Sequence, residues 1–378
     1  MNSSQPQTYL ETLEKVAVEV IRPAAVEIDR SGSFPQASMH ALAKSGLLGL
    51  ISAQEVGGMG QGLRAAALSI ERTAQECAST AMVLCMHYAG TAVIEAHGPR
   101  EIRQAIAKGR HITTLAFSES GSRSHFWTPV STAAASNGTV NLDASKSWVT
   151  SAGQADSYVW SSRPMGEAGA STLWLVPAHA SGLTIAGTFD GLGLRGNASS
   201  PISAKMVAVE RSAMLGPDGG GFDIMMAVVL PYFQTMVAAF SIGTMEAATR
   251  KAAAHVGGTQ FKHLGSSLSD LPTIRAYLAR MRIKTDTARA LLYDTLDAIE
   301  NNRADVMLRV LEVKAAAGEA STEVTDLAMR VCGGAAFRKD MGIERHFRDA
   351  RAATVMAPTT DVLYDFIGKV ECGLPLFG

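Results

Sequence analysis

Apolar residues recur three or four positions apart through most of the first 110 residues. The runs occupy residues 8–29, 37–50, 63–78 and 81–96. This spacing places the apolar side chains on one face of an α-helix. The pattern therefore predicts a helical domain over residues 1–110, interrupted by a glycine-rich loop at residues 55–62.

The hydrophobic period changes to two in the next part of the chain, which is typical of β-strands. The predicted strands are residues 112–117, 140–142, 158–161, 172–176 and 203–209. Asn137-Gly138 lies between two alternating runs and predicts a two-residue hairpin turn, because both turn positions require a positive φ. We expect a β domain over residues 111–215.

The helical period returns after the glycine-rich stretch at 216–221 and continues almost to residue 331. The predicted helices are residues 222–255, 268–300 and 304–331. Helices of this length, joined by short connections, indicate a C-terminal four-helix bundle over residues 216–378, and residues 373–378 are expected to form an extended tail. The fold class predicted is α+β, mainly α.

Composition and charge exclude several classes of protein. Hydrophobic residues make up 47% of the 378 residues and charged residues 18%, which indicates a folded chain rather than a disordered one. The net charge is -1 and like charges are not gathered into long runs, so we expect no nucleic-acid partner. Four scattered cysteines argue against a disulfide framework or a metal site and fit a reducing compartment.

The sequence also gives expectations about targeting. The first residues include acidic side chains and lack the uninterrupted apolar stretch of a signal peptide. The longest apolar run is broken by Pro231 and Gln234, so no membrane span is predicted. We therefore expect a cytoplasmic protein.

Two motifs in the β domain suggest a family. Phe117-Ser-Glu-Ser-Gly-Ser-Arg-Ser-His125 resembles the T-E-P-x-x-G-S-D motif of acyl-CoA dehydrogenases, and Lys146-Ser-Trp-Val-Thr150 resembles their K-x-W-I-T motif at the same spacing. Further matches are Gly191-Leu-Gly-Leu-Arg-Gly196, Cys332-Gly-Gly334 and Arg348-Asp-Ala-Arg351. The resemblance covers essentially the whole chain, and it implies an oxidoreductase that binds one FAD per subunit.

The resemblance assigns the first cofactor and substrate positions. Ser118, Trp148 and Thr150 match residues that border the flavin ring, where an indole can pack on the flat ring and hydroxyl groups can serve its polar edge. Ser124 matches a serine near the thioester of the bound acyl group. His125 stands where the family usually has aspartate.

The resemblance also implies a second cofactor region. Gly333 and Gly334 match a turn that reaches the adenosine diphosphate of FAD across a subunit contact, in a family that forms homotetramers. Arg330 occupies the glutamine position of that motif, whereas Phe261 occupies the position of the family's diphosphate-binding arginine. A guanidinium binds phosphate with paired donors, so the cation lost at one position is replaced at the other. Thr359 is a further expected cofactor contact.

The family's catalytic base is missing. Dehydrogenation of an acyl thioester needs a base that removes the α-proton while the flavin accepts the β-hydride. The usual glutamate corresponds to Ala357, and the alternative glutamate position of some members corresponds to Phe233, followed by Gln234 in place of an arginine. Asp361 is the nearest carboxylate in sequence, and its place after the catalytic turn fits a helix cap as well as a base.

Three functions remain open on these residues. The first is an acyl-CoA or acyl-carrier-protein dehydrogenase with a base in a new position. The second is a flavin-dependent monooxygenase or oxidase on the same fold, which needs no α-proton base and for which His87 and His125 are candidate proton donors. The third is a flavin-binding partner subunit without catalysis. The expected redox partner is an electron-transfer flavoprotein or a flavin reductase.

Overall fold

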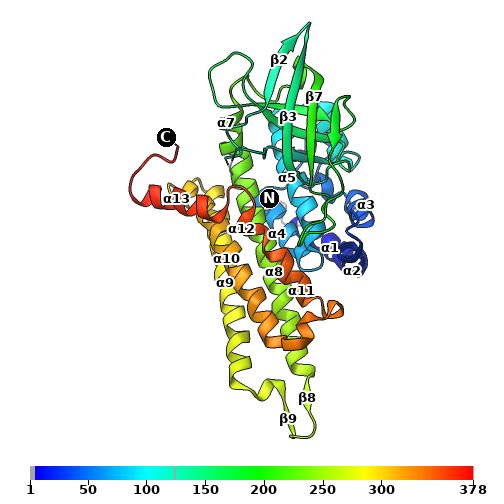
Figure 1. Ribbon diagram of the computed structural model, residues 1–378, viewed down its shortest axis with the longest axis vertical. Coiled ribbons are helices and arrows are strands. Elements are labelled where there is room, and N and C mark those ends of the chain that lie inside the picture. The colour runs from blue at the N-terminus through cyan, green and yellow to red at the C-terminus, as the bar shows by residue number, and fades with distance from the viewer. Residues whose placement is uncertain (1–4, 123–124, 378) are drawn as a thin grey trace.

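The computed structural model describes residues 5–122 and 125–377 (Figure 1). Helices come first along the chain, two sheets follow, and long helices complete the molecule. The sheets lie at one end of the elongated structure and the long helices extend away from them (Figure 1). The mainly helical α+β fold with a β domain in the middle is confirmed.

The N-terminal domain is built around one central helix, α5, Ala78–His97, which is apolar on almost every side and almost fully buried. The other elements are α1 (Gln5–Val16), a π-helical segment (Ala17–Ile21), α2 (Arg22–Ser31), α3 (Gln36–Lys44), α4 (Leu63–Ala74) and α6 (Arg100–Ala107). Because α4 and α5 both pack against the long helix α8, Leu230–Gly258, the two helical domains share one hydrophobic core.

The β domain consists of two sheets. In the first, β4 (Ser157–Ser162) lies between β1 (Thr113–Ala116) and β5 (Thr172–Pro177). In the second the order is β2 (Thr132–Ser136), β3 (Thr139–Val149), β7 (Ser200–Glu210) and β6 (Leu183–Ile185). Asn137 and Gly138 join β2 to β3 with φ angles of 44° and 89°, which confirms the predicted hairpin turn.

Three long helices form the centre of the C-terminal domain: α8, α9 (Pro272–Glu300) and α10 (Val306–Cys332). The shorter elements are α7 (Gly221–Ile224), a π-helical segment (Met225–Val229), α11 (Ile343–Ala350), α12 (Ala352–Val355) and α13 (Thr360–Glu371). A small hairpin, β8 (Gln260–Phe261) and β9 (Ser266–Ser267), lies at the end of the bundle away from the sheets (Figure 1).

Pro231 lies inside the helix predicted over residues 222–255 and does not end it. The chain is helical from Gly221 to Gly258, with the π-helical segment directly before the proline. This run is the one helix in the described part of the chain that is long and apolar enough to cross a membrane. Of its most apolar window, 67% is buried inside the structure, as in the central helix of a bundle.

Candidate active site

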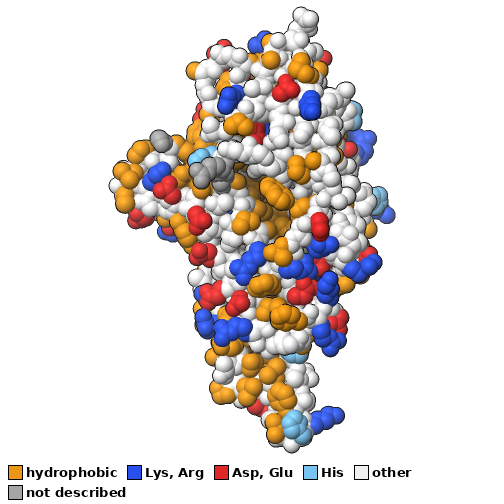
Figure 2. Space-filling model, in the orientation of Figure 1, with side chains coloured by type: hydrophobic (Ala, Val, Ile, Leu, Met, Phe, Trp, Pro, Cys, Tyr) orange, Lys and Arg blue, Asp and Glu red, His pale blue; other side chains and the backbone are white. Residues whose placement is uncertain are grey.

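One cavity lies where the β domain meets the helices. Its β-domain wall includes Ser118 and Trp148, and its helical wall includes Phe233 and Ala357. The other described residues that line it are Met86, Leu115, Phe117, Phe126, Ser147, Val229 and Leu230. Figure 2 shows hydrophobic side chains gathered in a hollow below the β domain. Two of the three expected ring-contacting residues and both expected base positions thus meet in a single space.

Trp148 has an unusual backbone conformation at this cavity. Its φ is 55°, and the pairing of β3 with β7 shifts register between Lys146 and Val149. A bulge of this kind re-aims a side chain, and a bulky residue in the left-handed region costs about 1–3 kcal/mol. The indole is 69% exposed and has Phe189 as an edge-on neighbour. The strained conformation therefore leaves a large aromatic face exposed at the cavity.

A buried ion pair connects the two sequence motifs. Lys146 Nζ contacts Glu119 Oε1 and donates to the Ser161 carbonyl oxygen at 2.7 Å, with both charged side chains inaccessible to water. Glu119 also accepts hydrogen bonds from the Val130 and Ser131 amides at 2.6 and 3.0 Å. Burial lowers the pKa of Lys146 to about 8 against the opposing effect of Glu119. The pair holds the segment after β1, which contains Ser118, next to β3, which contains Trp148.

A second buried lysine holds the turn that contains Ala357. Lys314 Nζ, on α10, donates to the carbonyl oxygens of Met356 and Pro358 at 2.9 and 2.7 Å. Burial lowers the pKa of Lys314 to about 7. The sequence analysis missed this residue, although a lone lysine in the apolar run Val313-Lys-Ala-Ala-Ala317 of a core helix is a signal of such a role. Lys314 is a positioning residue for the turn.

His87 lies in the core rather than on the cavity wall. Its Nε2 is 3.0 Å from the Leu48 carbonyl oxygen, and its Nδ1 accepts a hydrogen bond from the Thr113 amide at 3.3 Å. Burial lowers the pKa of His87 to about 4. With both ring nitrogens bonded to backbone groups, the imidazole serves the packing of α5 against β1. This arrangement offers no free nitrogen to a substrate.

The other two base candidates are exposed. His125 packs against Trp127, with ring centroids 5.0 Å apart, and Asp361 lies in the first turn of α13. Neither residue is among those that line the cavity. The described lining residues include no acid, base or other charged side chain. The described walls of this cavity therefore supply no carboxylate or imidazole that could accept a proton from a substrate.

The remaining expected ring and substrate contacts are placed differently. Thr150 is buried and its hydroxyl oxygen is 3.1 Å from that of Ser199, so its side chain points into the β domain. Thr359 caps α13 by accepting a hydrogen bond from the Val362 amide at 3.5 Å. Ser124 lies outside the described residues. These three stay predictions.

The second set of expected cofactor residues lies far from the cavity. Arg330, Gly333 and Gly334 are at the end of α10, on the part of the bundle that also carries the β8–β9 hairpin with Phe261 (Figure 1). Arg330 donates to the Tyr277 hydroxyl at 2.7 Å and stacks on its ring. No acidic partner of Arg330 occurs in the described part of the chain. Within one subunit the two sets of residues do not form one site.

Another pair of matched motifs has a structural role. The Leu194 amide donates to Asp349 at 2.7 Å, and a Cβ on Gly193 would lie 2.6 Å from the Arg348 carbonyl group. Arg348 also forms an ion pair with Asp29 of α2 at 2.7 Å. These contacts join α2, the 191–196 loop and α11, so they hold the three domains together.

The residues present fit a bound FAD. An exposed indole beside an apolar cavity suits a flat ring, and the Gly333-Gly334 turn is open, with no atom within 4 Å of where a Cβ would stand. Arg330 supplies a cation without a competing carboxylate for a diphosphate group. Because the two regions do not form one site within one subunit, a single dinucleotide would contact both only between two subunits.

Comparisons with known proteins identify the family of this chain. Family models match in three consecutive parts: acyl-CoA dehydrogenase N-terminal domain over residues 3–109, middle domain over 114–207 and C-terminal domain over 219–371. Short-chain specific acyl-CoA dehydrogenase from Homo sapiens mitochondria is 28% identical over 366 residues, which cover 94% of this chain and 87% of that protein.

Solved structures have the same fold at low identity. Butyryl-CoA dehydrogenase from Megasphaera elsdenii is 22% identical with a TM-score of 0.90, and the match covers 98% of this chain and 99% of that one. PigA in its FAD complex is 18% identical with a TM-score of 0.90, covering 99% and 98%. The matched domains, their order and the motifs at their junctions lead to one conclusion. This chain belongs to the acyl-CoA dehydrogenase family.

Proposed function

We propose that this protein is an FAD-dependent oxidoreductase that α,β-dehydrogenates an acyl thioester, of CoA or of a carrier protein, with a base other than the usual glutamate. The observation that carries the proposal is the single cavity in which Ser118 and Trp148 face the helical residues Phe233 and Ala357. Bound FAD would supply the two-electron oxidation. The apolar walls would exclude water from the reacting bond.

The proposed dehydrogenation needs a residue that accepts the α-proton, and the family's usual residue is absent. Ala357 cannot take a proton, and the two carbonyl contacts of Lys314 fix the turn around it. Asp361 follows that turn and is the first side chain to test, and His125 beside Trp127 is the second. A base at either position must reach the cavity through a change in side-chain conformation, which predicts slow chemistry.

Anaerobic mixing of the FAD-loaded protein with straight-chain acyl-CoA is expected to bleach the flavin absorbance slowly. The reason is that no carboxylate is among the described walls of the cavity. Stopped-flow absorbance over several chain lengths, and with a carrier-protein thioester, measures the rate. Complete absence of bleaching with every thioester would contradict dehydrogenation.

A second candidate function is oxygen-dependent monooxygenation or oxidation on the same fold. It is favoured by the same walls, which lack charged side chains among the described residues, because such chemistry needs no α-proton base. Oxygen uptake and a hydroxylated product after external reduction of the flavin would support it. Failure of both reactions would leave a flavin-binding partner subunit as the remaining function.

Assembly into a homotetramer, or at least a dimer, is part of the proposal. The apolar part of a groove on α9 and α10 is formed by Ile283, Leu291, Ala316 and Ala320, and the charged residues Arg280 and Lys284 also line the groove. Ile283 is 64% exposed. An exposed apolar patch of this kind suits contact with a second subunit. We further propose a cytoplasmic location and an electron-transfer flavoprotein or a flavin reductase as redox partner.

Substitution of Arg330 is expected to weaken FAD binding. A hydrogen bond to a charged group contributes about 1.5–3 kcal/mol, so Arg330→Ala should raise the FAD dissociation constant about 10- to 100-fold. Arg330→Gln, which restores the family's residue, should retain more affinity than the alanine variant. Fluorescence titration of each apoprotein with FAD measures the two dissociation constants. Light scattering on the same samples measures the state of assembly. A monomer that still binds FAD tightly would contradict the placement of Arg330 across a subunit contact.

A further inference from the structure

The segment that follows α13 folds back onto the body of the protein instead of extending away from it. The Leu374 amide donates to the Lys369 carbonyl oxygen at 2.8 Å after a turn at Gly373. Lys369 Nζ then donates to the Leu376 carbonyl oxygen at 3.5 Å. This backward course brings Phe377 against Trp127, Phe222 and Phe366.

Phe377 sits in a cluster of three aromatic rings. Its ring centroid is 5.3 Å from that of Trp127, 5.1 Å from Phe222 and 5.3 Å from Phe366, each in an edge-on arrangement. Edge-on pairs of this kind each add about 0.5–1.5 kcal/mol beyond the burial of apolar area. The side chain nevertheless remains 38% exposed. The ring is therefore held at a specific place on the surface rather than in the core.

Phe377 and Leu376 close a space that adjoins the candidate acyl cavity. They line a small void together with Phe126 and Leu230, and these last two residues also line the cavity that contains Ala357. Pro358, the neighbour of Ala357, lines the same void. The void has a volume of about 10 Å³, at the lower limit for one water molecule. The folded-back segment thus lines a space that shares two wall residues with the cavity.

The walls of this space are apolar in every described residue. An apolar space accepts the hydrocarbon end of an acyl group and disfavours the polar thioester end, because a buried polar group without a partner costs free energy. The space therefore suits the far end of an acyl chain whose reacting carbons lie between Trp148 and Ala357.

We propose that Leu376 and Phe377 determine the size of the acyl group that this protein accepts. The Phe377 ring occupies the position that the distal carbons of a longer acyl chain would need, so the wild-type protein takes short acyl groups. This specificity assignment rests on the proposed function of the cavity as an acyl-thioester site.

The test measures binding of straight-chain acyl-CoA of increasing length to the FAD-loaded protein by calorimetry under anaerobic conditions. Each further buried CH₂ group strengthens binding about fourfold. In the wild-type protein this gain should stop after the first few carbons, whereas in Phe377→Ala it should continue over several more. Phe377→Leu, which keeps most of the bulk, should retain the wild-type limit. Leu374 lies in the same segment and is 56% exposed, so Leu374→Ala is the control. It should leave the chain length at which the gain in affinity stops unchanged.

Three outcomes would overturn the assignment. Identical chain-length preference in Phe377→Ala and wild type would remove it and leave the proposed function in place. An equal gain in affinity at every chain length would show that the segment covers the entrance rather than the far end. Absence of binding of any acyl-CoA to either protein would overturn the proposed function together with this assignment.

Discussion

The substitution Ala357→Glu is expected to accelerate flavin reduction by acyl-CoA by as much as about 100- to 10,000-fold, the usual contribution of general-base catalysis. Ala357 lines the same cavity as Ser118 and Trp148, so a carboxylate there would face a substrate placed against the flavin ring. The apolar walls would raise the pKa of the new glutamate toward neutrality, where a base works best. Anaerobic stopped-flow absorbance measures the gain.

Recovery is expected to be partial for two structural reasons. Gln234 stands where the family has an arginine that neighbours the catalytic carboxylate, and Pro358 restricts the backbone of the turn. Lys314, whose Nζ binds the carbonyl oxygens on both sides of Ala357, would keep that turn in place. Ala357→Gln is the matched control, because glutamine has the same shape and cannot accept the proton. Equal rates for the glutamate and glutamine variants, or rapid reduction of the unmodified protein, would show that the base lies elsewhere.

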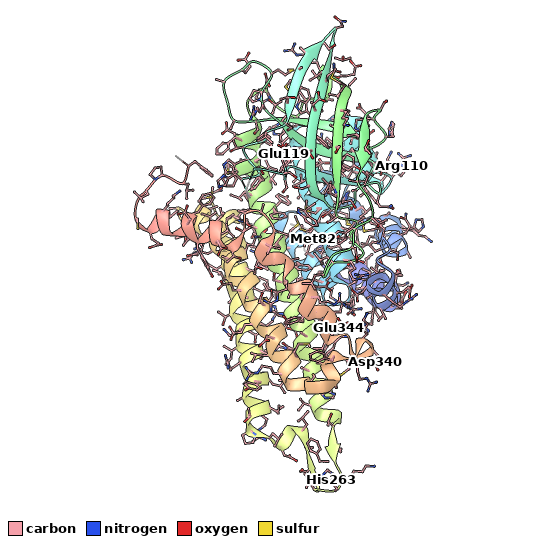
Figure 3. The ribbon with its side chains drawn as sticks, in the orientation of Figure 1. Met82, Arg110, Glu119, His263, Asp340 and Glu344 are labelled. Atoms are coloured by element: carbon pink, nitrogen blue, oxygen red, sulfur yellow. The ribbon has the colours of Figure 1, made fainter. Side chains whose placement is uncertain are left out.

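The substitution Lys146→Met is expected to lower the free energy of unfolding by about 3–5 kcal/mol, because it leaves the buried Glu119 carboxylate without its cation. Both side chains of this pair are inaccessible to water, and Glu119 lies where the β domain meets the helices (Figure 3). The segment after β1 that contains Ser118 should separate from β3, which contains Trp148, so FAD should be lost at lower denaturant concentration than in the wild type. Urea unfolding followed by flavin fluorescence and by circular dichroism measures both effects.

Two controls separate this effect from a general loss of charge. The double variant Lys146→Met, Glu119→Leu removes both charges and should recover much of the stability, since no unpaired charge remains. Asp340→Asn removes one partner of the exposed Arg338–Asp340 pair, labelled at Asp340 in Figure 3, and should change stability by less than about 1 kcal/mol. Equal losses of stability in the Lys146→Met and Asp340→Asn variants would contradict the stabilising role of the buried Lys146–Glu119 pair.

The sequence by itself determined the order of the domains and the regions that form the candidate site. The spacing of apolar residues predicted the long helices, because a helix that buries one face has apolar residues every three or four positions. Asn137-Gly138 predicted the hairpin, because few other residues adopt the backbone angles of its turn. Residue type and spacing were enough to identify the motifs around Ser118 and Trp148 in the sequence. They also showed that Ala357 replaces the family's carboxylate.

Only the tertiary structure decided which of these residues meet. It placed Ser118, Trp148, Phe233 and Ala357 around one cavity and left Arg330 at the other end of the bundle, because long-range packing has no local sequence signal. It also showed that His87 is bonded to backbone on both ring nitrogens, which a histidine on an apolar helix does not reveal in sequence.

Two further features were decided by packing between distant segments. Residues 373–377 looked like an extended tail in sequence, yet Phe377 packs against Trp127 and Phe222, which lie far away along the chain. Lys314 looked like one charge in an alanine-rich helix, and the fold brought its amine to the carbonyl groups beside Ala357. In both cases the partners are set by the arrangement of helices around a shared core, and a local pattern contains no information about that arrangement.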